Sequence, residues 1–143
     1  MKIRELMTDS VIKIRAEETV EVAARTMAHY NIGAAPVCSG SGKLCGMVTD
    51  RDLVTRCLAA GKNPAVTKVA DVMTSALVTA APEMEISAAA HLMGRQQIRR
   101  LPVVENGKLC GMVSLGDLAV REESSYEASD ALSMISSNVS VRD

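Results

Sequence analysis

The sequence contains the string GKLCGMV twice, at residues 42–48 and 107–113. After each copy, a Ser or Thr and an Asp stand three residues apart. Shifting the chain by about 66 residues extends the match, because EETVEVAARTMAHYNIGAAPV then aligns with EMEISAAAHLMGRQQIRRLPV. A repeat of about 60 residues that occurs twice is too long and too rare for a solenoid. It indicates two copies of one supersecondary unit.

Within each copy, the spacing of apolar residues predicts a strand, a helix, a hairpin and a second helix. In the first copy we expect a strand over Val11–Ile14 and a helix from the N-cap Thr19 to about Tyr30. The segments AAPVC and KLCGMVT are predicted strands around an SGSG turn, and ENG replaces that turn in the second copy. A final helix over Asp50–Ala59 should end at Gly61. Each unit is therefore β-α-β-β-α, and the fold class is a mixed α+β fold.

The repeat also predicts how the chain is divided. Residues 1–60 form the first repeat, 61–68 a linker, 69–122 the second repeat, and 123–143 an acidic tail that we expect to be partly helical. IRELMT and VADVMT should form a short helix before each repeat. One unit alone would leave a sheet face half covered, so we expect the two copies to pack about a pseudo-twofold axis. Gly46 and Gly111, inside the duplicated string, should allow close approach of another backbone segment.

Composition narrows the class of protein. Hydrophobic residues make up 48% of the chain, which is enough for a core, while Trp and Phe are absent and the net charge is −1. Few aromatic residues and little charge argue against binding of single-stranded or duplex nucleic acid. No apolar run approaches the roughly 20 residues of a membrane span, and the first residues lack the pattern of a secretory signal. We therefore expect a cytoplasmic protein with no membrane association.

No catalytic or metal site is predicted. The sequence lacks GxSxG, a P-loop and an acidic metal cluster, and His29 and His91 are expected to be exposed helix residues without a partner. The four cysteines form no CxxC motif, and Cys45 and Cys110 are expected to act as small apolar residues within strands. A binding role is favoured over an enzymatic one.

The polar segment after each GKLCGMV string is the candidate for binding chemistry. A strand that ends at Thr49 and a helix that starts at Asp50 would present free backbone N–H groups, which favour an anion such as phosphate. The Thr49 hydroxyl can donate to that phosphate, and Asp52 can accept hydrogen bonds from the diol of a ribose. Ser114 and Asp117 repeat the arrangement. The alternative is that these residues only cap their helices.

Residues 1–121 resemble a CBS-domain pair, also called a Bateman module. The similarity rests on VMT before the first strand, IRRLPVV at the central strand and the GxVSxxDL pattern at the last strand–helix junction. The chain is similar to small stand-alone bacterial proteins with two CBS domains. The resemblance implies a non-catalytic regulatory module for energy sensing that binds an adenine nucleotide between its repeats. It also implies a homodimer formed through the CBS helices, acting on a regulated protein that the sequence does not identify.

The resemblance implies AMP, ADP or ATP as the ligand, with NAD or S-adenosylmethionine as other candidates and no required cofactor. It also implies two composite clefts. We call each one after the repeat that supplies its Ser or Thr and its Asp. The second-copy cleft would use Thr8, Ile12, Ile32, Gly33, Arg99, Arg100, Ser114 and Asp117. The first-copy cleft would use the backbone at Gly33 and Ala34 together with Thr49, Arg51, Asp52, Thr74, Val78 and Ile98.

The two copies differ in their cations. Arg99 and Arg100 of the second copy replace Gly33 and Ala34 of the first, whereas the first copy has Arg51 where the second has Gly116. The two clefts should therefore not bind identically. An adjacent pair of arginines beside a phosphate site is suited to clamp it, so we expect the second-copy cleft to bind more tightly.

An interaction adaptor with vestigial clefts is the alternative function. In the tail, Ala128, Leu132 and Ile135 are spaced for a short amphipathic helix. Such a helix would dock on a partner or on the other subunit, or it would be a frayed extension.

Overall fold

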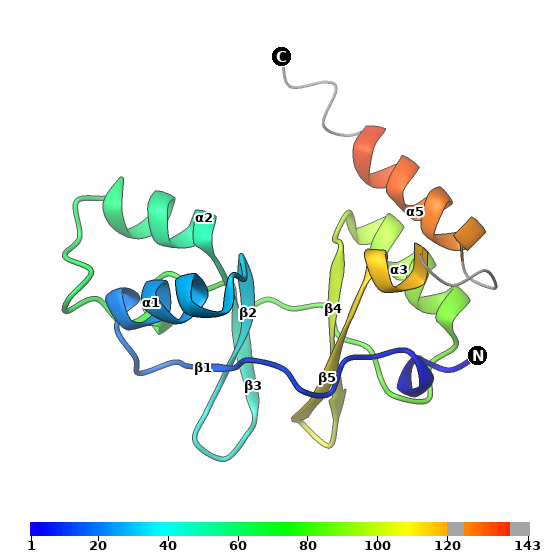
Figure 1. Ribbon diagram of the computed structural model, residues 1–143, viewed down its shortest axis with the longest axis horizontal. Helices are drawn as coiled ribbons and strands as arrows, with labels where there is room; N and C mark the ends of the chain where they lie inside the picture. The colour runs from blue at the N-terminus through cyan, green and yellow to red at the C-terminus, as the bar shows by residue number, and fades with distance from the viewer. Residues whose placement is uncertain (120–124, 138–143) are drawn as a thin grey trace. The chain divides into compact units, whose positions relative to one another are not determined.

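The computed structural model describes residues 1–119 and 125–137, and these residues divide into two compact units (Figure 1). The Thr49 unit comprises residues 11–77 and 107–109. The Ser114 unit comprises residues 1–10, 78–106 and the described residues from 110 onward. Both units mix helices with a small sheet, which confirms the predicted fold class. No helix within the described residues is long and apolar enough to cross a membrane.

The Thr49 unit is built on a three-stranded sheet. Its strands are ordered β1-β2-β3, with β1 parallel and β3 antiparallel to the central β2. Helix α1 and the helical segment after β3 lie on one side of this sheet (Figure 1). The elements in chain order are β1 (Ile14–Arg15), α1 (Val20–Tyr30), β2 (Ala34–Cys38), β3 (Leu44–Thr49), α2 (Asp50–Asp52), η2 (Leu53–Leu58) and η3 (Val69–Asp71).

Helix α1 has the bounds that its sequence predicts. Thr19 Oγ1 accepts a hydrogen bond from the Val22 amide at 3.3 Å, which caps the first turn. The helix ends at Asn31, which adopts the left-handed conformation with φ of 53°. Val20, Ala23 and Met27 lie on one face at helical spacing and are buried in the core of the unit. The pattern of apolar residues thus identified both the element and the face that it buries.

Two predicted elements of this unit differ in detail. The first strand is Ile14–Arg15 rather than Val11–Ile14, because the chain has just left the Ser114 unit at residue 10 and pairs with β2 only from Ile14 onward. The expected helix over Asp50–Ala59 is one α-helical turn followed by the π-helical segment η2, in which the Ala59 amide donates to the Val54 carbonyl. Thr55 Oγ1 donates to the Arg51 carbonyl at 2.9 Å, and such side-chain competition for a helix carbonyl loosens the regular ladder.

The Ser114 unit has fewer strand pairs and more helix. Strands β4 and β5 form a two-stranded sheet, and Asn106 and Gly107 turn the chain between them with φ of 54° and 79°. The expected first strand of the second repeat is reduced to one parallel bridge, in which Ala80 pairs with Val103. The elements are η1 (Ile3–Glu5), α3 (Ile86–Gln96), β4 (Arg100–Glu105), β5 (Lys108–Ser114), α4 (Leu115–Ala119) and α5 (Ser125–Ser137).

The segment before each repeat packs in the unit of the other repeat. The amide of Ile3 donates to the Met84 carbonyl at 2.9 Å, and the Ile3 side chain is fully buried in the core of the Ser114 unit. In the same way, the Val69 amide donates to the Glu18 carbonyl at 2.8 Å within the Thr49 unit. In the sequence, each leading segment stands directly before its own repeat. In the structure, each leading segment packs in the unit that is formed mainly by the other repeat.

The glycines of the duplicated string, Gly46 and Gly111, make room for these leading segments. A Cβ on Gly46 would lie 2.7 Å from the Thr74 carbonyl oxygen, and a Cβ on Gly111 would lie 2.6 Å from that of Thr8. Both contacts are too short for any side chain, so each glycine lets the leading segment cross the strand. The predicted reason for Gly46 and Gly111 is confirmed.

Helix α5 belongs to the core of the Ser114 unit. Ala128, Ala131 and Ile135 are 2%, 2% and 7% exposed, and they join the buried cluster of that unit. The helix approaches α3 closely at Gly94, where a Cβ would lie 3.1 Å from Ala131 Cα. Among the residues proposed for an external docking face, only Leu132 is exposed. That expectation was therefore wrong for Ala128 and Ile135, because the unit itself buries the apolar edge of α5.

Candidate functional site

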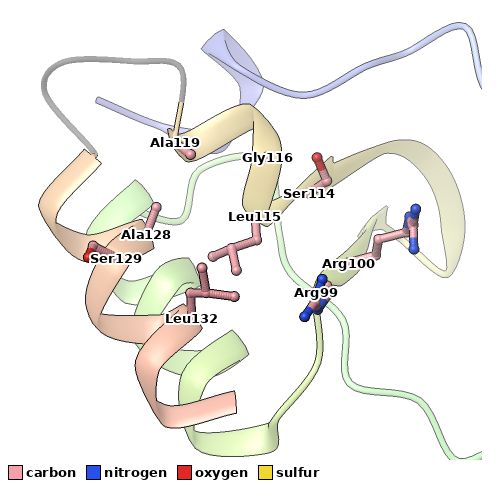
Figure 2. Close-up of a pocket in the computed structure, with 9 residues that line it drawn as sticks. All are labelled: Arg99, Arg100, Ser114, Leu115, Gly116, Ala119, Ala128, Ser129 and Leu132. Carbon is pink, nitrogen blue, oxygen red and sulfur yellow. The ribbon is translucent and has the colours of Figure 1, made fainter. Parts of the chain in front are cut away.

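The Ser114 unit contains a pocket of about 590 Å³ between the start of β4, helix α4 and helix α5 (Figure 2). We call it the arginine–α5 pocket. Arginine side chains lie on one side of it, and residues of α5 lie on the other. It is lined by Arg99, Arg100, Ser114, Leu115, Gly116, Ala119, Ala128, Ser129 and Leu132.

The cationic side of the pocket is held in place by the backbone. Arg99 and Arg100 are the last residue before β4 and its first residue, and both are exposed. The Arg99 carbonyl accepts a hydrogen bond from the Leu115 amide at 2.8 Å, which joins the start of β4 to the start of α4. Within residues 1–119 and 125–137, neither arginine side chain forms an ion pair or a hydrogen bond. Both arginines therefore line the pocket without a carboxylate partner from the described chain, and the Arg100 side chain extends away from α5 (Figure 2).

Ser114 and Asp117 bind each other at the junction between β5 and α4. The Ser114 amide donates to Asp117 Oδ2 at 2.9 Å, and the Asp117 amide donates to Ser114 Oγ at 3.1 Å. This is a capping box, in which each side chain satisfies a backbone N–H of the other residue. Oδ1 of Asp117 has no hydrogen-bond partner in the part of the chain that the structure describes. The Ser114 hydroxyl accepts one bond and keeps its proton for another acceptor.

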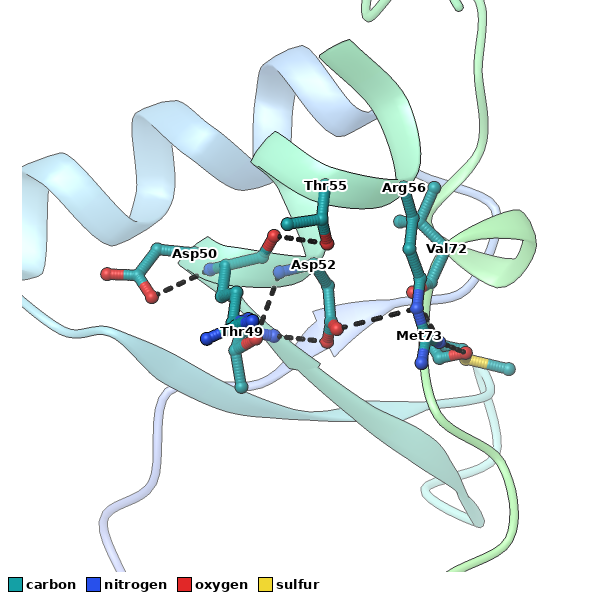
Figure 3. A network of polar contacts seen from close by, with 8 residues as sticks. Thr49, Asp50, Asp52, Thr55, Arg56, Val72 and Met73 are labelled. Carbon is teal, nitrogen blue, oxygen red and sulfur yellow. Dashed lines mark hydrogen bonds and ion pairs between the residues drawn. The ribbon is translucent and has the colours of Figure 1, made fainter. Parts of the chain in front are cut away.

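The same capping box forms in the Thr49 unit, with one added contact (Figure 3). The Thr49 amide donates to Asp52 Oδ2 at 2.9 Å, and the Asp52 amide donates to Thr49 Oγ1 at 3.1 Å. Here the other carboxylate oxygen, Oδ1, lies 3.8 Å from Arg56 Nε. Arg56 also donates to the backbone carbonyls of Val72 and Met73, both at 3.3 Å. Asp52 is thus tied into the structure of its unit at both oxygens.

The capping alternative is therefore correct as far as it goes, since all four residues cap their helices. It does not exhaust their chemistry. A capping box uses one carboxylate oxygen and the lone pair of one hydroxyl. Among the described residues, Asp117 has one carboxylate oxygen without a partner, whereas both oxygens of Asp52 are engaged, and the two copies differ in this respect.

The expected site residues fall on both units. Arg99, Arg100 and Ser114, which were predicted for one cleft, line the arginine–α5 pocket. The residues of both expected clefts that belong to the Ser114 unit are Thr8, Val78, Ile98, Arg99, Arg100, Ser114 and Asp117. Those in the Thr49 unit are Ile12, Ile32, Gly33, Ala34, Thr49, Arg51, Asp52 and Thr74. Both composite clefts draw on both units and stay predictions.

Sequence reasoning missed six of the nine described residues that line the pocket. Leu115, Gly116 and Ala119 follow Ser114 directly, and α5 adds Ala128, Ser129 and Leu132. The signal for α5 was present, because residues 128, 129 and 132 lie on one side of a helix. That helix was expected to dock on a partner or on the other subunit, or to be a frayed extension, since no pattern in the sequence indicates that the tail returns to its own unit.

The histidines and cysteines do not form a metal site within the described residues. His29 and His91 are exposed on α1 and α3, as expected, and the His29 ring packs edge-on against Tyr30 with centroids 4.7 Å apart. No group of three or more His, Cys, Asp or Glu residues in residues 1–119 and 125–137 is arranged to hold a metal ion. Burial raises the pKa of the Cys38 thiol above its usual value, although nearby Lys13 opposes the shift. Cys38 therefore behaves as a protonated core residue.

Comparison with known proteins gives a consistent result. The sequence profile of the CBS domain matches residues 3–59 and 69–122. The CBS domain-containing protein YhcV of Bacillus subtilis is 42% identical over 134 residues, which span 94% of each chain. The crystal structure of Hypoxic Response Protein I with two coordinated zinc ions has a TM-score of 0.77 at 32% identity, and covers 83% of this chain and 97% of that one.

A further crystal structure shares the fold at lower identity. It shows a CBS domain pair in complex with 5′-methylthioadenosine and S-adenosyl-L-methionine. The TM-score is 0.72 at 23% identity, and the match covers 83% of this chain and 93% of that one.

Proposed function

This chain belongs to the CBS-domain family, and from that premise we propose that it is a non-catalytic regulatory module that binds an adenine nucleotide at the Ser114–Asp117 junction. CBS-domain pairs are regulatory modules that often bind adenine ligands. The observation that carries the proposal is the pair Arg99 and Arg100. These cations have no ion pair with a described residue and line a pocket beside a serine hydroxyl, and one oxygen of the neighbouring aspartate has no partner among the described residues.

Each part of this junction matches one part of a nucleotide. Guanidinium groups bind phosphate through paired N–H donors, and the Ser114 hydroxyl can donate its free proton to a phosphate oxygen. The unused Oδ1 of Asp117 can accept from a ribose hydroxyl. Hydrogen bonds to charged groups contribute about 1.5–3 kcal/mol each, so three or four of them support micromolar binding, which needs about 8 kcal/mol.

The Ser114 unit is favoured over the Thr49 unit as the tighter site. Asp52 is engaged by Arg56 through the oxygen that Asp117 leaves unused, and no arginine pair stands at Gly33 and Ala34. A ribose would have to displace Arg56 in the Thr49 unit. The contribution of each unit to the other's cleft, including Ile12, Ile32, Val78 and Ile98, stays part of this proposal.

Thermal unfolding with AMP, ADP, ATP, NAD and S-adenosylmethionine at millimolar concentration tests the proposal. We expect at least one of them to raise the midpoint of the wild-type protein. Asp117→Asn should abolish the shift while keeping a cap acceptor, whereas Asp52→Asn should retain most of it. If none of the five ligands stabilises the wild type, the nucleotide proposal is wrong.

A homodimer through the CBS helices is a second part of the proposed function. Val22, Tyr30, Val54 and Leu58 are large apolar side chains exposed on α1 and η2 of the Thr49 unit. Exposed apolar residues gathered on two helices are typical of an interface between chains. Sedimentation of the wild type and of Leu58→Glu tests this: we expect a dimer that the charge weakens, and a wild-type monomer would exclude it.

The adaptor alternative was expected to dock through α5, but only Leu132 of its three expected residues is exposed, so we propose the exposed residues of α1 and η2 as its docking surface instead. An adaptor would keep its apolar helices and lose nothing when Asp117 is changed, so the pull-down of bound proteins by Asp117→Asn and by Leu58→Glu separates the two functions. The cytoplasmic location and a role in energy sensing also belong to the proposal. Binding of the nucleotide would change the packing of the module, and this change would signal to a regulated protein.

A further inference from the structure

We propose that the arginine–α5 pocket binds a second organic group that is joined to the phosphate of the ligand and covers the apolar wall of the pocket, so that helix α5 is part of the binding site. This inference rests on the proposed function and narrows its ligand class. The ligand would be a nucleotide conjugate, with a second organic group on the phosphate, rather than a mononucleotide.

The size of the pocket is the first argument. Its volume of about 590 Å³ falls in the range of roughly 300–1,000 Å³ that is usual for sites of drug-sized molecules. A phosphate group on the two arginines needs only the cationic edge. The space beyond that edge extends to α5 (Figure 2). A mononucleotide that placed only its phosphate here would leave most of the pocket to water.

The chemistry of the walls is the second argument. Opposite the arginines, the described part of the wall is formed by Leu115, Ala119, Ala128 and Leu132, together with the hydroxyl of Ser129. None of the described residues that line the pocket is a carboxylate, so these residues do not repel an anion at its edge. An arginine edge with an apolar wall matches a molecule that is charged at one point and apolar beyond it.

The position of Leu132 is the third argument. The buried edge of α5, formed by Ala128, Ala131 and Ile135, already holds the helix against its unit. Leu132 is not needed for that packing, because its side chain is 42% exposed and lines the pocket. A ligand group that covered Leu132 would bury apolar surface on α5, and occupancy would then stabilise the docked helix.

Three variants test the inference. Ser129→Trp fills the pocket and introduces the only tryptophan, because the chain has none. Ser133→Trp, exposed on the same helix but outside the pocket lining, is the matched control. Leu132→Asp places a carboxylate in the wall without adding bulk. Circular dichroism first establishes that each variant is folded, and AMP, NAD and coenzyme A are then titrated by calorimetry, with tryptophan fluorescence as a second readout.

We expect NAD or coenzyme A to bind the wild type roughly tenfold more tightly than AMP, because their added nicotinamide or pantetheine part would cover apolar surface of the pocket wall that AMP leaves exposed. Ser129→Trp and Leu132→Asp should remove that advantage, and Ser133→Trp should keep it. The fluorescence of Trp introduced at position 129 should change with the conjugate and not with AMP. The inference is overturned if AMP binds as tightly as both conjugates, or if the pocket variants leave the ratio unchanged, and in either case the proposed function stands. If neither AMP nor a conjugate binds, the proposed function and this inference fall together.

Discussion

Ser114 and Asp117 exchange two hydrogen bonds, from the Ser114 amide to Asp117 Oδ2 at 2.9 Å and from the Asp117 amide to Ser114 Oγ at 3.1 Å. One carboxylate oxygen of Asp117 therefore caps the helix, and the other has no partner among the described residues. Thr49 and Asp52 form the same pair, but Arg56 engages the second oxygen. The two copies of the motif cap their helices in the same way. They differ in whether a carboxylate oxygen is left, among the described contacts, to bind a ligand.

The two tasks of Asp117 should separate in substitutions. Asp117→Ala removes the acceptor of the Ser114 amide, and we expect it to lower the free energy of unfolding by about 1–2 kcal/mol. Asp117→Asn keeps an amide oxygen as acceptor, so its loss should be less than about 1 kcal/mol. Both should abolish nucleotide binding. Urea unfolding measures the first quantity and calorimetry the second, and equal losses of stability would contradict the capping role.

Gly111 should be intolerant of a side chain, whereas Gly116 should not. An added Cβ on Gly111 would lie 2.6 Å from the Thr8 carbonyl oxygen, while on Gly116 its nearest neighbour would be Ser114 Oγ at 3.7 Å. We expect Gly111→Ala to lower the unfolding free energy by about 1–3 kcal/mol through overpacking. Gly116→Ala, in helix α4, should change it by less or raise it. Thermal or urea unfolding of the two variants makes the comparison, and similar losses would argue against the crossing segment as the cause.

Helix α5 should stabilise the chain through Ile135 and not through Leu132. Ile135 is 7% exposed and Leu132 is 42% exposed. Ile135→Ala should cost about 2–4 kcal/mol, because it leaves a cavity in the core of the Ser114 unit. Leu132→Ala should cost less than about 1 kcal/mol. If both variants unfold like the wild type, α5 does not dock on its own unit in solution.

Cys38 should make stability fall at alkaline pH. Burial raises the pKa of its thiol in the folded protein. The folded chain therefore keeps this proton to a higher pH than the unfolded chain, where the thiol has its usual pKa of about 8.5. The contribution is complete below the unfolded value and is lost as pH rises through the folded value.

Urea unfolding of the wild type and of Cys38→Ala between about pH 8 and pH 10 checks this, since 8.5 lies within that range. The wild type should lose more stability over the interval than the variant, because only the wild type carries the buried thiol. Other groups that titrate there are common to both proteins. A parallel decline of the two curves would mean that the Cys38 thiol ionises as easily in the folded chain as in the unfolded one.

Local features of the fold followed from local sequence. Helix α1 was predicted with its end residues, because a Thr19 cap, a helical spacing of apolar residues and Asn31 act within one segment. The hairpins and the role of Gly46 and Gly111 were equally accessible, since a repeat shows which positions are kept. The π-helical segment η2 was not predicted, because its hydrogen bonds differ from those of an α-helix while its residue spacing looks the same.

By itself, the sequence determined that the chain is a duplicated α+β unit of one family and that Ser114 and Asp117 stand at a strand–helix junction. Periodicity and repetition are visible in the order of the residues, and they can be recognised without any knowledge of packing. Only the tertiary structure decided that residues 1–10 pack with the second repeat and that α5 closes a pocket opposite Arg99 and Arg100. It also decided that Arg56 contacts the second carboxylate oxygen of Asp52, whereas no described residue contacts that of Asp117. Each of these depends on side chains that are distant in the sequence, and their contacts arise only when the core of each unit has formed.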